Sequence, residues 1–174
     1  MNNVFCSSDP AWFLELLRSA SPSLEELRVW NPGEGHLLAV HGMPRLRRLD
    51  LQCTEGDLDE APPVLPALPH RSGLQWLRVG GLPLATTRSL LLAHGPALEV
   101  LWLDMGAVPG GEWPEGCSDL AALLAPCAAL ARLVFRRHDH DRGACRDQLT
   151  VARAALPACT VQCQQCDRVA YEDF

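Results

Sequence analysis

A spaced leucine pattern recurs along the chain and predicts repeated strands. Each copy has a Leu, two residues, a second Leu, one residue and an apolar residue. Successive copies begin 22, 28, 24, 32 and 26 residues apart, close to the ~20–29 residues of leucine-rich repeats. The copies are Leu24-Leu27-Val29, Leu46-Leu49-Leu51, Leu74-Leu77-Val79, Leu98-Leu101-Leu103, Leu130-Leu133-Phe135 and a degenerate Leu156-Cys159-Val161.

The end of each copy has the period of a strand. Side chains two residues apart lie on the same face of a strand, so the last two apolar residues enter one core. The first Leu enters the same core from the preceding turn. We therefore predict an α/β leucine-rich-repeat solenoid, with a curved parallel sheet of about six short strands and with helices and loops on its convex side.

Helical segments are expected between the strands. The first begins at Asp9-Pro10, because Asp caps helices well and Pro suits a first turn. Four prolines limit any helix between Asp57 and His70. The first helix should bury Trp12, Phe13, Leu16 and Leu17. Other segments are a brief turn at His36 to His41, and helices at Leu84 to His94, Asp119 to Ala125 (capped by Ser118) and Cys145 to Leu156.

One domain of 174 residues is expected, because this length is typical of a single domain. Residues 1–21 form an amino-terminal helix and cap, 22–143 the repeats, and 144–174 a last repeat and capping tail. The insertion from Gly106 to Cys117 is predicted to be an edge loop, more simply variable than functional.

Alternation assigns the strand residues that point away from the core. Three of the five tryptophans and five arginines fall at these positions, and both residue types are enriched at interaction hot spots. We predict a partner-binding face on which the indoles stay exposed until a protein covers them. Its residues are Arg28, Trp30, Arg48, Asp50, Trp76, Arg78, Trp102, Asp104, Arg132 and Arg136.

Two alternatives remain for this face. Its residues could pair with one another, as Arg28 with Asp50 or an arginine with a stacked indole would. A terminal tail could also cover the tryptophans. If the face does bind a partner, its excess of arginine favours an acidic or phosphorylated segment, since guanidinium groups bind carboxylate and phosphate in bidentate fashion.

The repeats resemble those of F-box/leucine-rich-repeat proteins, in the segments LLRSASPSLEELRV, LLAHGPALEVLWL and LLAPCAALARLVF. The resemblance implies substrate recognition for a ubiquitin ligase of the SCF type. No F-box is recognisable before Asp9, so docking on Skp1 requires an F-box in a longer product. The alternative is a stand-alone repeat scaffold or inhibitor unrelated to ubiquitin.

Charge and composition narrow the partners. The net charge of −6 argues against nucleic acid. No apolar stretch reaches the ~20 residues that span a bilayer, and no signal peptide is recognisable, so we expect no membrane partner and a cytoplasmic or nuclear protein. The chain has no Lys. This would protect a ligase subunit from ubiquitination, but a GC-rich coding region explains it better, because Ile is missing as well.

Chemistry-bearing motifs are sparse, and we predict no enzyme, no catalytic residue and no cofactor. Cys163 and Cys166 have zinc-ligand spacing, but a zinc site needs a second pair of ligands. Cys159 with a distant His is a poor substitute, so we predict no metal site and reduced, incidental thiols. His138-Asp139-His140-Asp141 is interpreted as a solvated loop rather than a weak metal site.

Overall fold

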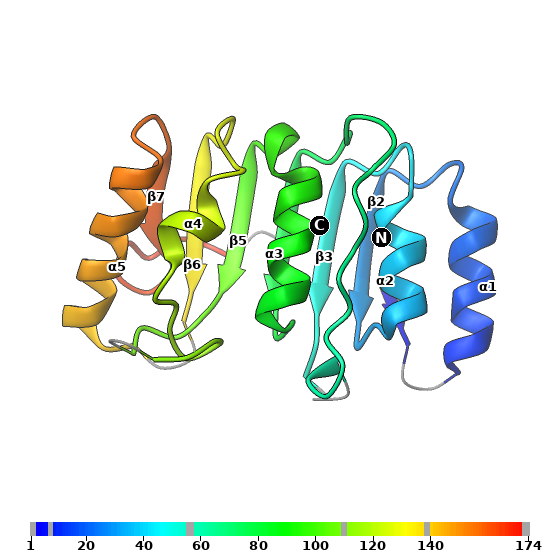
Figure 1. Ribbon diagram of the computed structural model, residues 1–174, viewed down its shortest axis with the longest axis horizontal. Coiled ribbons are helices and arrows are strands. Elements are labelled where there is room, and N and C mark those ends of the chain that lie inside the picture. Colours follow the sequence, from blue (N-terminus) through cyan, green and yellow to red (C-terminus); the bar gives the residue numbers. More distant parts are fainter. Residues whose placement is uncertain (1–2, 7–8, 55–57, 109–110, 138–139, 172–174) are drawn as a thin grey trace.

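A seven-stranded parallel sheet, with its strands in sequence order, forms one layer of the protein (Figure 1). The computed structural model describes residues 3–6, 9–54, 58–108, 111–137 and 140–171. The chain is therefore an α/β protein. The strands are β1 (Asn3–Phe5), β2 (Glu26–Trp30), β3 (Arg48–Gln52), β4 (Trp76–Gly80), β5 (Val100–Asp104), β6 (Arg132–Arg136) and β7 (Thr160–Cys163).

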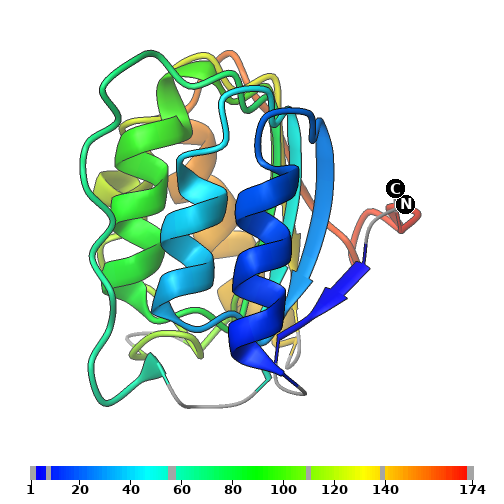
Figure 2. The ribbon, with the colours of Figure 1, turned by 90° about the vertical axis from the view of Figure 1, so that its right-hand side faces the viewer.

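The helices form a second layer on one side of the sheet, while the segment that follows β7 extends on the other side (Figure 2). Because every strand is parallel to the next, each connection must return along the sheet, and the connecting segments cross the same face. The helices are α1 (Pro10–Ala20), α2 (Glu34–His41), α3 (Leu84–His94), the 3-10 helix η2 (Gly95–Ala97), α4 (Leu120–Leu124) and α5 (Arg142–Ala155).

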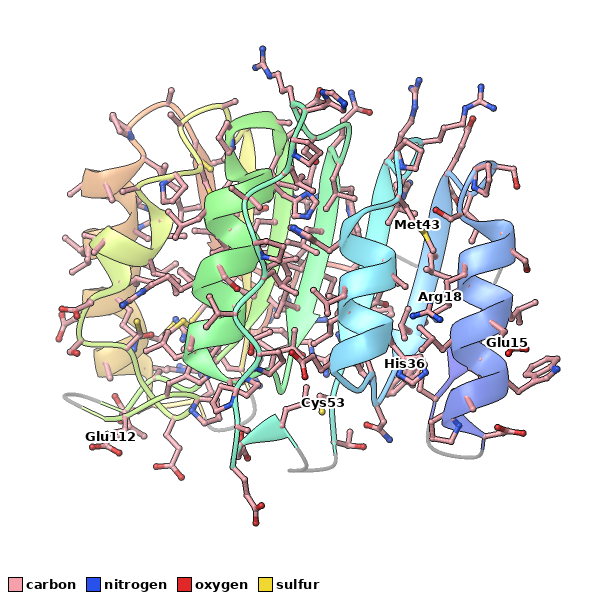
Figure 3. All side chains as sticks on the ribbon, turned by 45° about the vertical axis from the view of Figure 1, so that its right-hand side comes forward. Glu15, Arg18, His36, Met43, Cys53 and Glu112 are labelled. Atoms are coloured by element: carbon pink, nitrogen blue, oxygen red, sulfur yellow. The ribbon has the colours of Figure 1, made fainter. Side chains whose placement is uncertain are left out.

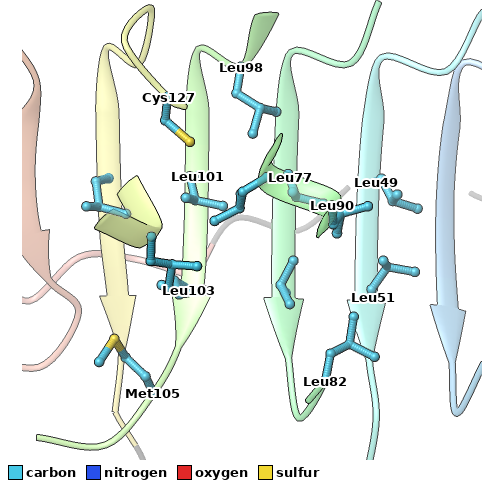
Figure 4. Close-up of a cluster of buried hydrophobic side chains, with 14 of the residues drawn as sticks. Leu49, Leu51, Leu77, Leu82, Leu90, Leu98, Leu101, Leu103, Met105 and Cys127 are labelled. Atoms are coloured by element: carbon cyan, nitrogen blue, oxygen red, sulfur yellow. The ribbon is translucent and has the colours of Figure 1, made fainter. Parts of the chain in front are cut away.

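The repeated leucines form the core between the two layers. Equivalent leucines of successive strands lie side by side in register, and none is more than 1% exposed. Figure 4 shows several of them facing Leu90 of α3 and Cys127. The row consists of Leu27, Leu49, Leu77, Leu101 and Leu133. The leucine pattern thus predicted the strands correctly from β2 to β7.

The predicted helices agree with the structure, with local corrections. The helix at Leu84 to His94 is confirmed, and the Asp9 carboxylate accepts a hydrogen bond from the Trp12 amide at 3.1 Å. Within α1, however, Trp12 and Leu16 are exposed. The buried stripe was therefore predicted too wide, because only one side of α1 meets α2 and the sheet.

The other helices differ at their ends. α2 has eight residues instead of one brief turn, with His36 between α1 and α2 (Figure 3) and its Nε2 2.8 Å from the Pro10 carbonyl oxygen. α4 begins after Asp119 rather than Ser118. α5 begins at Arg142 because Asp141 caps it, accepting from the Ala144 amide at 2.8 Å. No α-helix forms between residues 58 and 70, as the prolines predicted.

Two features were missed. β1 pairs with β2 ahead of the first leucine copy, and its three residues carry no repeat pattern. The insertion is also less of a free loop than expected, since Trp113 packs against the core and its indole N–H donates to the Leu82 carbonyl at 2.7 Å. Residues 109–110 of the insertion lie outside the described residues.

A buried histidine pair joins the second and third helices. His41 Nδ1 lies 3.0 Å from His94 Nε2, and His94 Nδ1 lies 2.6 Å from the Ser72 hydroxyl. Burial lowers the pKa of His94 to about 4, with His41 adding to the effect. Burial also lowers the pKa of His41, against a hydrogen bond to the Pro66 carbonyl. Both rings are therefore neutral in the folded protein near pH 7.

We predict that His94→Gln flattens the acid limb of the stability curve. Below pH ~6.5 the unfolded chain protonates this histidine, whereas the folded chain does so only near pH 4. The unfolded state binds more protons in that window. The contribution of the neutral His94 to the free energy of unfolding is therefore fully present above pH ~6.5, and it falls by about 3 kcal/mol towards pH 4. Urea unfolding from pH 7 to 4.5 measures this loss, and the variant should lack it.

The exposed His70 provides a control. His70→Gln should keep the parent's loss of stability between pH 6.5 and pH 4, because it leaves His94 in place. The two curves must be compared as a difference, because other groups titrate in the same window. Parallel curves for the parent and His94→Gln would contradict the assignment of the lowered pKa.

Candidate partner-binding face

Alternate strand residues point to the side of the sheet that carries no helix, as the alternation predicted. Trp76, Trp102 and Val134 form a hydrophobic cluster separate from the leucine core. We call this surface the open face. Its central row, in register across six strands, is Arg28, Asp50, Arg78, Trp102, Val134 and Gln162.

Asp50 is the anionic centre of the open face. Its Oδ2 lies 2.8 Å from Arg28 Nε and 3.1 Å from Arg78 Nη1, and its Oδ1 accepts from Gln52 at 2.9 Å. Asp50 and Arg78 are both fully buried. Because removal of charges from water is costly, each must be compensated by the other. The alternative of pairing within the face is therefore confirmed at Asp50.

Arg78 is also enclosed by aromatic rings. Its guanidinium carbon lies 5.0 Å from the Trp76 ring centroid, 5.1 Å from that of Trp102 and 4.0 Å from that of Tyr171. A guanidinium within ~6 Å of a ring face is attracted by the ring quadrupole. Two of these rings come from the sheet, and the third comes from the carboxyl-terminal end of the chain.

The carboxyl-terminal residues lie across the open face. We call residues 164–171 the covering segment; Figure 2 shows this segment on the side without helices. It begins with a turn in which the Val169 amide donates to the Gln164 carbonyl at 3.0 Å. Val169 then packs against the Trp76–Trp102–Val134 cluster, and Tyr171 meets Trp102 at 6.3 Å between centroids.

The predicted exposure of the indoles is wrong for two of the three. Trp76 is 5% exposed and Trp102 is 0% exposed. The physical reason is that Val169 and Tyr171, the large apolar residues of the covering segment, pack on the indoles and remove them from water. The alternative of a covering tail is therefore confirmed here. Two apolar residues in this tail were the available sequence signal.

The amino-terminal end of the open face is less covered. Trp30 is half-buried and stacks on Phe5 of β1, with 5.9 Å between centroids. Phe5 itself is 53% exposed. The guanidinium carbon of Arg48 lies 5.1 Å from the Trp76 ring centroid, and its Nε lies 4.0 Å from Glu26 Oε1. Aromatic surface therefore remains accessible next to β2.

Polar contacts between strands also connect β5, β6 and β7 on the open face. Asp104 Oδ2 lies 3.0 Å from Arg136 Nη2, and Arg132 donates to Gln162 at 3.1 Å. Burial raises the pKa of Asp104 to about 7, although Arg136 and Arg78 oppose this rise. Asp104 thus titrates near neutral pH, and its buried carboxyl group makes the net charge of the open face sensitive to pH.

Sequence reasoning missed a second cluster. Cys163 and Cys166 meet Cys145 and His140, and the four ligand atoms lie within 4.8 Å of one another. Cys145 was overlooked because it fits the apolar pattern of α5, and His140 because it stands in a polar loop. His138 and Asp139 lie outside the described residues, and Asp141 is used as the α5 cap.

Comparisons with known proteins add no relative. No protein-family model matches the chain, and neither the curated proteins nor the solved structures include a match. No helix in the described part of the chain combines the length and apolar character needed to cross a bilayer.

We predict that Asp50→Asn destabilises the fold. The amide keeps the shape but leaves Arg78 buried without a full counter-charge, and breaking a buried pair costs about 3–5 kcal/mol. Denaturant unfolding at pH 7 measures the loss. Asp59→Asn, at an exposed position, should stay within about 0.5 kcal/mol of the parent. Equal midpoints for the two variants would contradict the pairing.

Proposed function

We propose that the chain is a protein-recognition module of the leucine-rich-repeat type that binds a partner segment along its open face. The repeat spacing and the sequential order of parallel strands support this interpretation. In such an architecture each repeat packs against its neighbours, and the sheet offers an extended binding surface. We propose a binding function without catalysis.

The aromatic enclosure of Arg78 carries the proposal. The buried guanidinium of Arg78 lies near two indoles of the sheet. A third aromatic ring, that of Tyr171, contacts it from the covering segment. The contact is local and involves one side chain of a short segment. A partner that offers an aromatic residue in an extended segment can make the same contact, so the covering segment acts as a competitor in the same chain.

The charge of the open face adds a second requirement. Five arginines stand against Glu26, Asp50 and Asp104 on this surface, and the buried Asp104 is partly protonated near pH 7. The surface therefore favours an acidic or phosphorylated segment. In the chain's own sequence, Tyr171 is followed by Glu172 and Asp173, the same combination of an aromatic and acidic residues.

The resemblance to F-box proteins suggests which kind of partner this is. If the resemblance holds, the open face binds a substrate of a ubiquitin ligase, and an F-box in a longer product binds Skp1. In the alternative version the module is a stand-alone scaffold or inhibitor. Co-purification of Skp1 with the full product in cells distinguishes them.

We predict that removal of residues 168–174 converts the chain into a peptide binder. The truncated chain, ending at Asp167, should bind a labelled peptide of residues 168–174 in fluorescence anisotropy, and the intact chain should bind it more weakly. Changing Tyr171 to Ala in the peptide should weaken binding about tenfold, as expected for the loss of a desolvated cation–π contact with its buried area.

A random peptide display on the truncated chain extends this test to foreign partners. Enriched sequences should combine an aromatic residue with acidic neighbours, and the free 168–174 peptide should compete with them. A truncated chain that remains folded by circular dichroism but enriches nothing, or enriches peptides without an aromatic residue, would show that the covering segment is a permanent cap.

A further inference from the structure

Four potential metal ligands converge at the carboxyl-terminal end of the sheet. Cys163 is the last residue of β7, Cys166 follows in the next turn, Cys145 lies in the first turn of α5, and His140 precedes that helix. Each offers one ligand atom, and all four atoms lie within 4.8 Å of one another. Cys166 Sγ lies 3.1 Å from His140 Nε2.

We propose that His140, Cys145, Cys163 and Cys166 form a structural zinc site. Three thiolates and one imidazole are an established ligand set for tetrahedral zinc, with Zn–S bonds of about 2.3 Å that place sulfur atoms about 3.8 Å apart. The separations in the cluster, at most 4.8 Å, therefore exceed that value by no more than about 1 Å. The site would be closed to substrate, because all four positions are taken by the chain.

Chance clustering explains this arrangement less well. A cysteine that serves only as a small hydrophobe points into the apolar core, as Cys6 and Cys127 do. Cys145 and Cys163 are equally buried and belong to the same core, yet their sulfur atoms also lie within 4.8 Å of the exposed Cys166 thiol and the His140 ring nitrogen. All eight cysteines are free, so no disulfide accounts for the approach of the three sulfur atoms.

The surroundings also suit a bound cation. The Cys163–Cys166 turn is fixed by the Asp167 carboxylate, which accepts from the Cys163 amide at 2.7 Å, and by the Asp167 amide, which donates to the Cys163 carbonyl at 2.9 Å. Gln165 donates to the Arg137 carbonyl at 3.0 Å. Such outer hydrogen bonds orient metal ligands.

The charges of the loaded site balance in a defined way. Binding of Zn²⁺ to three thiols and a neutral imidazole releases three protons and leaves one net negative charge. The buried Arg137 interacts electrostatically with Cys145, so a compensating cation is already in place. No oxidant or further reactant is required.

The site has a structural consequence for the open face. The turn that holds Cys163 and Cys166 leads directly to Val169 and Tyr171, the two residues that cover Trp76 and Trp102. Zinc would therefore fix the origin of the covering segment relative to α5 and β7. This consequence extends the proposed function, whereas zinc binding itself does not depend on it.

The test uses the full chain, purified under reducing conditions. Inductively coupled plasma mass spectrometry should find about one zinc per chain. Cobalt substitution should give the intense d–d absorption of a tetrahedral site and thiolate-to-cobalt charge-transfer bands. A folded chain that holds no zinc and gives no tetrahedral cobalt spectrum would overturn the proposal.

Matched variants identify the ligands. Cys166→Ser and His140→Ala should weaken cobalt affinity by more than the ~10–100-fold that loss of an outer-shell partner costs. His140→Cys should retain binding and increase the charge-transfer intensity, because a fourth thiolate is added. Cys159→Ser is the control, since Cys159 lies close in sequence but outside the cluster, and it should bind like the parent. Equal affinity for the control and Cys166→Ser would overturn the assignment.

Acrylamide quenching of tryptophan fluorescence separates the two proposals. Zinc removal by a chelator should increase the quenching in the full chain by releasing the covering segment, and should change it little in the chain that ends at Asp167. Zinc binding without an effect on quenching would leave the metal site standing and contradict its link to the open face. Peptide binding by the truncated chain tests the proposed function, and its outcome does not depend on the outcome of the zinc measurements.

Discussion

The in-register alignment of parallel strands is the constraint on which the rest of the structure depends. Because side chains alternate between the two faces of a strand, one register sets two rows at once. Leu49, Leu77 and Leu101 stand side by side towards the helices. Asp50, Arg78 and Trp102 stand side by side on the other face. A shift of one residue in any strand would bring charges into the core and leucines into the open face.

The same alignment explains why a charged surface can be buried. Adjacent strands bring Arg28 and Arg78 to either side of Asp50, so the opposite charges meet without distortion of the backbone. The indoles on neighbouring strands then flank the Arg78 guanidinium. Val169 and Tyr171 cover the central part of this layer. The open face is therefore a second, thinner interior with polar and aromatic contents.

The sequence predicted what depends on local periodicity and missed what depends on distant residues. Leucine spacing located the strands from β2 onwards, and Asp9-Pro10 located the start of α1. β1 was missed because three residues form no repeat and gain their order only from pairing with β2. Alternation identified the outward Trp and Arg residues. It carried no information on the covering segment, whose Val169 must reach back to strands far earlier in the chain.

The metal-ligand cluster was missed for the same reason. Cys163 and Cys166 are neighbours in sequence, but Cys145 and His140 join them through the packing of α5 on β7. A helix brings its first turn to a given strand only after the tertiary fold has formed. For this reason, the spacing of cysteines along the chain could predict half of the cluster and no more.

The lengths of the outermost strands have a consequence for assembly. β1 has three residues and β7 has four, whereas the strands between them have five. An unpaired strand edge is a template on which further chains can add, and short edges offer few backbone groups for such addition. Within the described part of the chain the sheet therefore narrows at both ends, and this shape limits stacking of copies edge to edge into fibres.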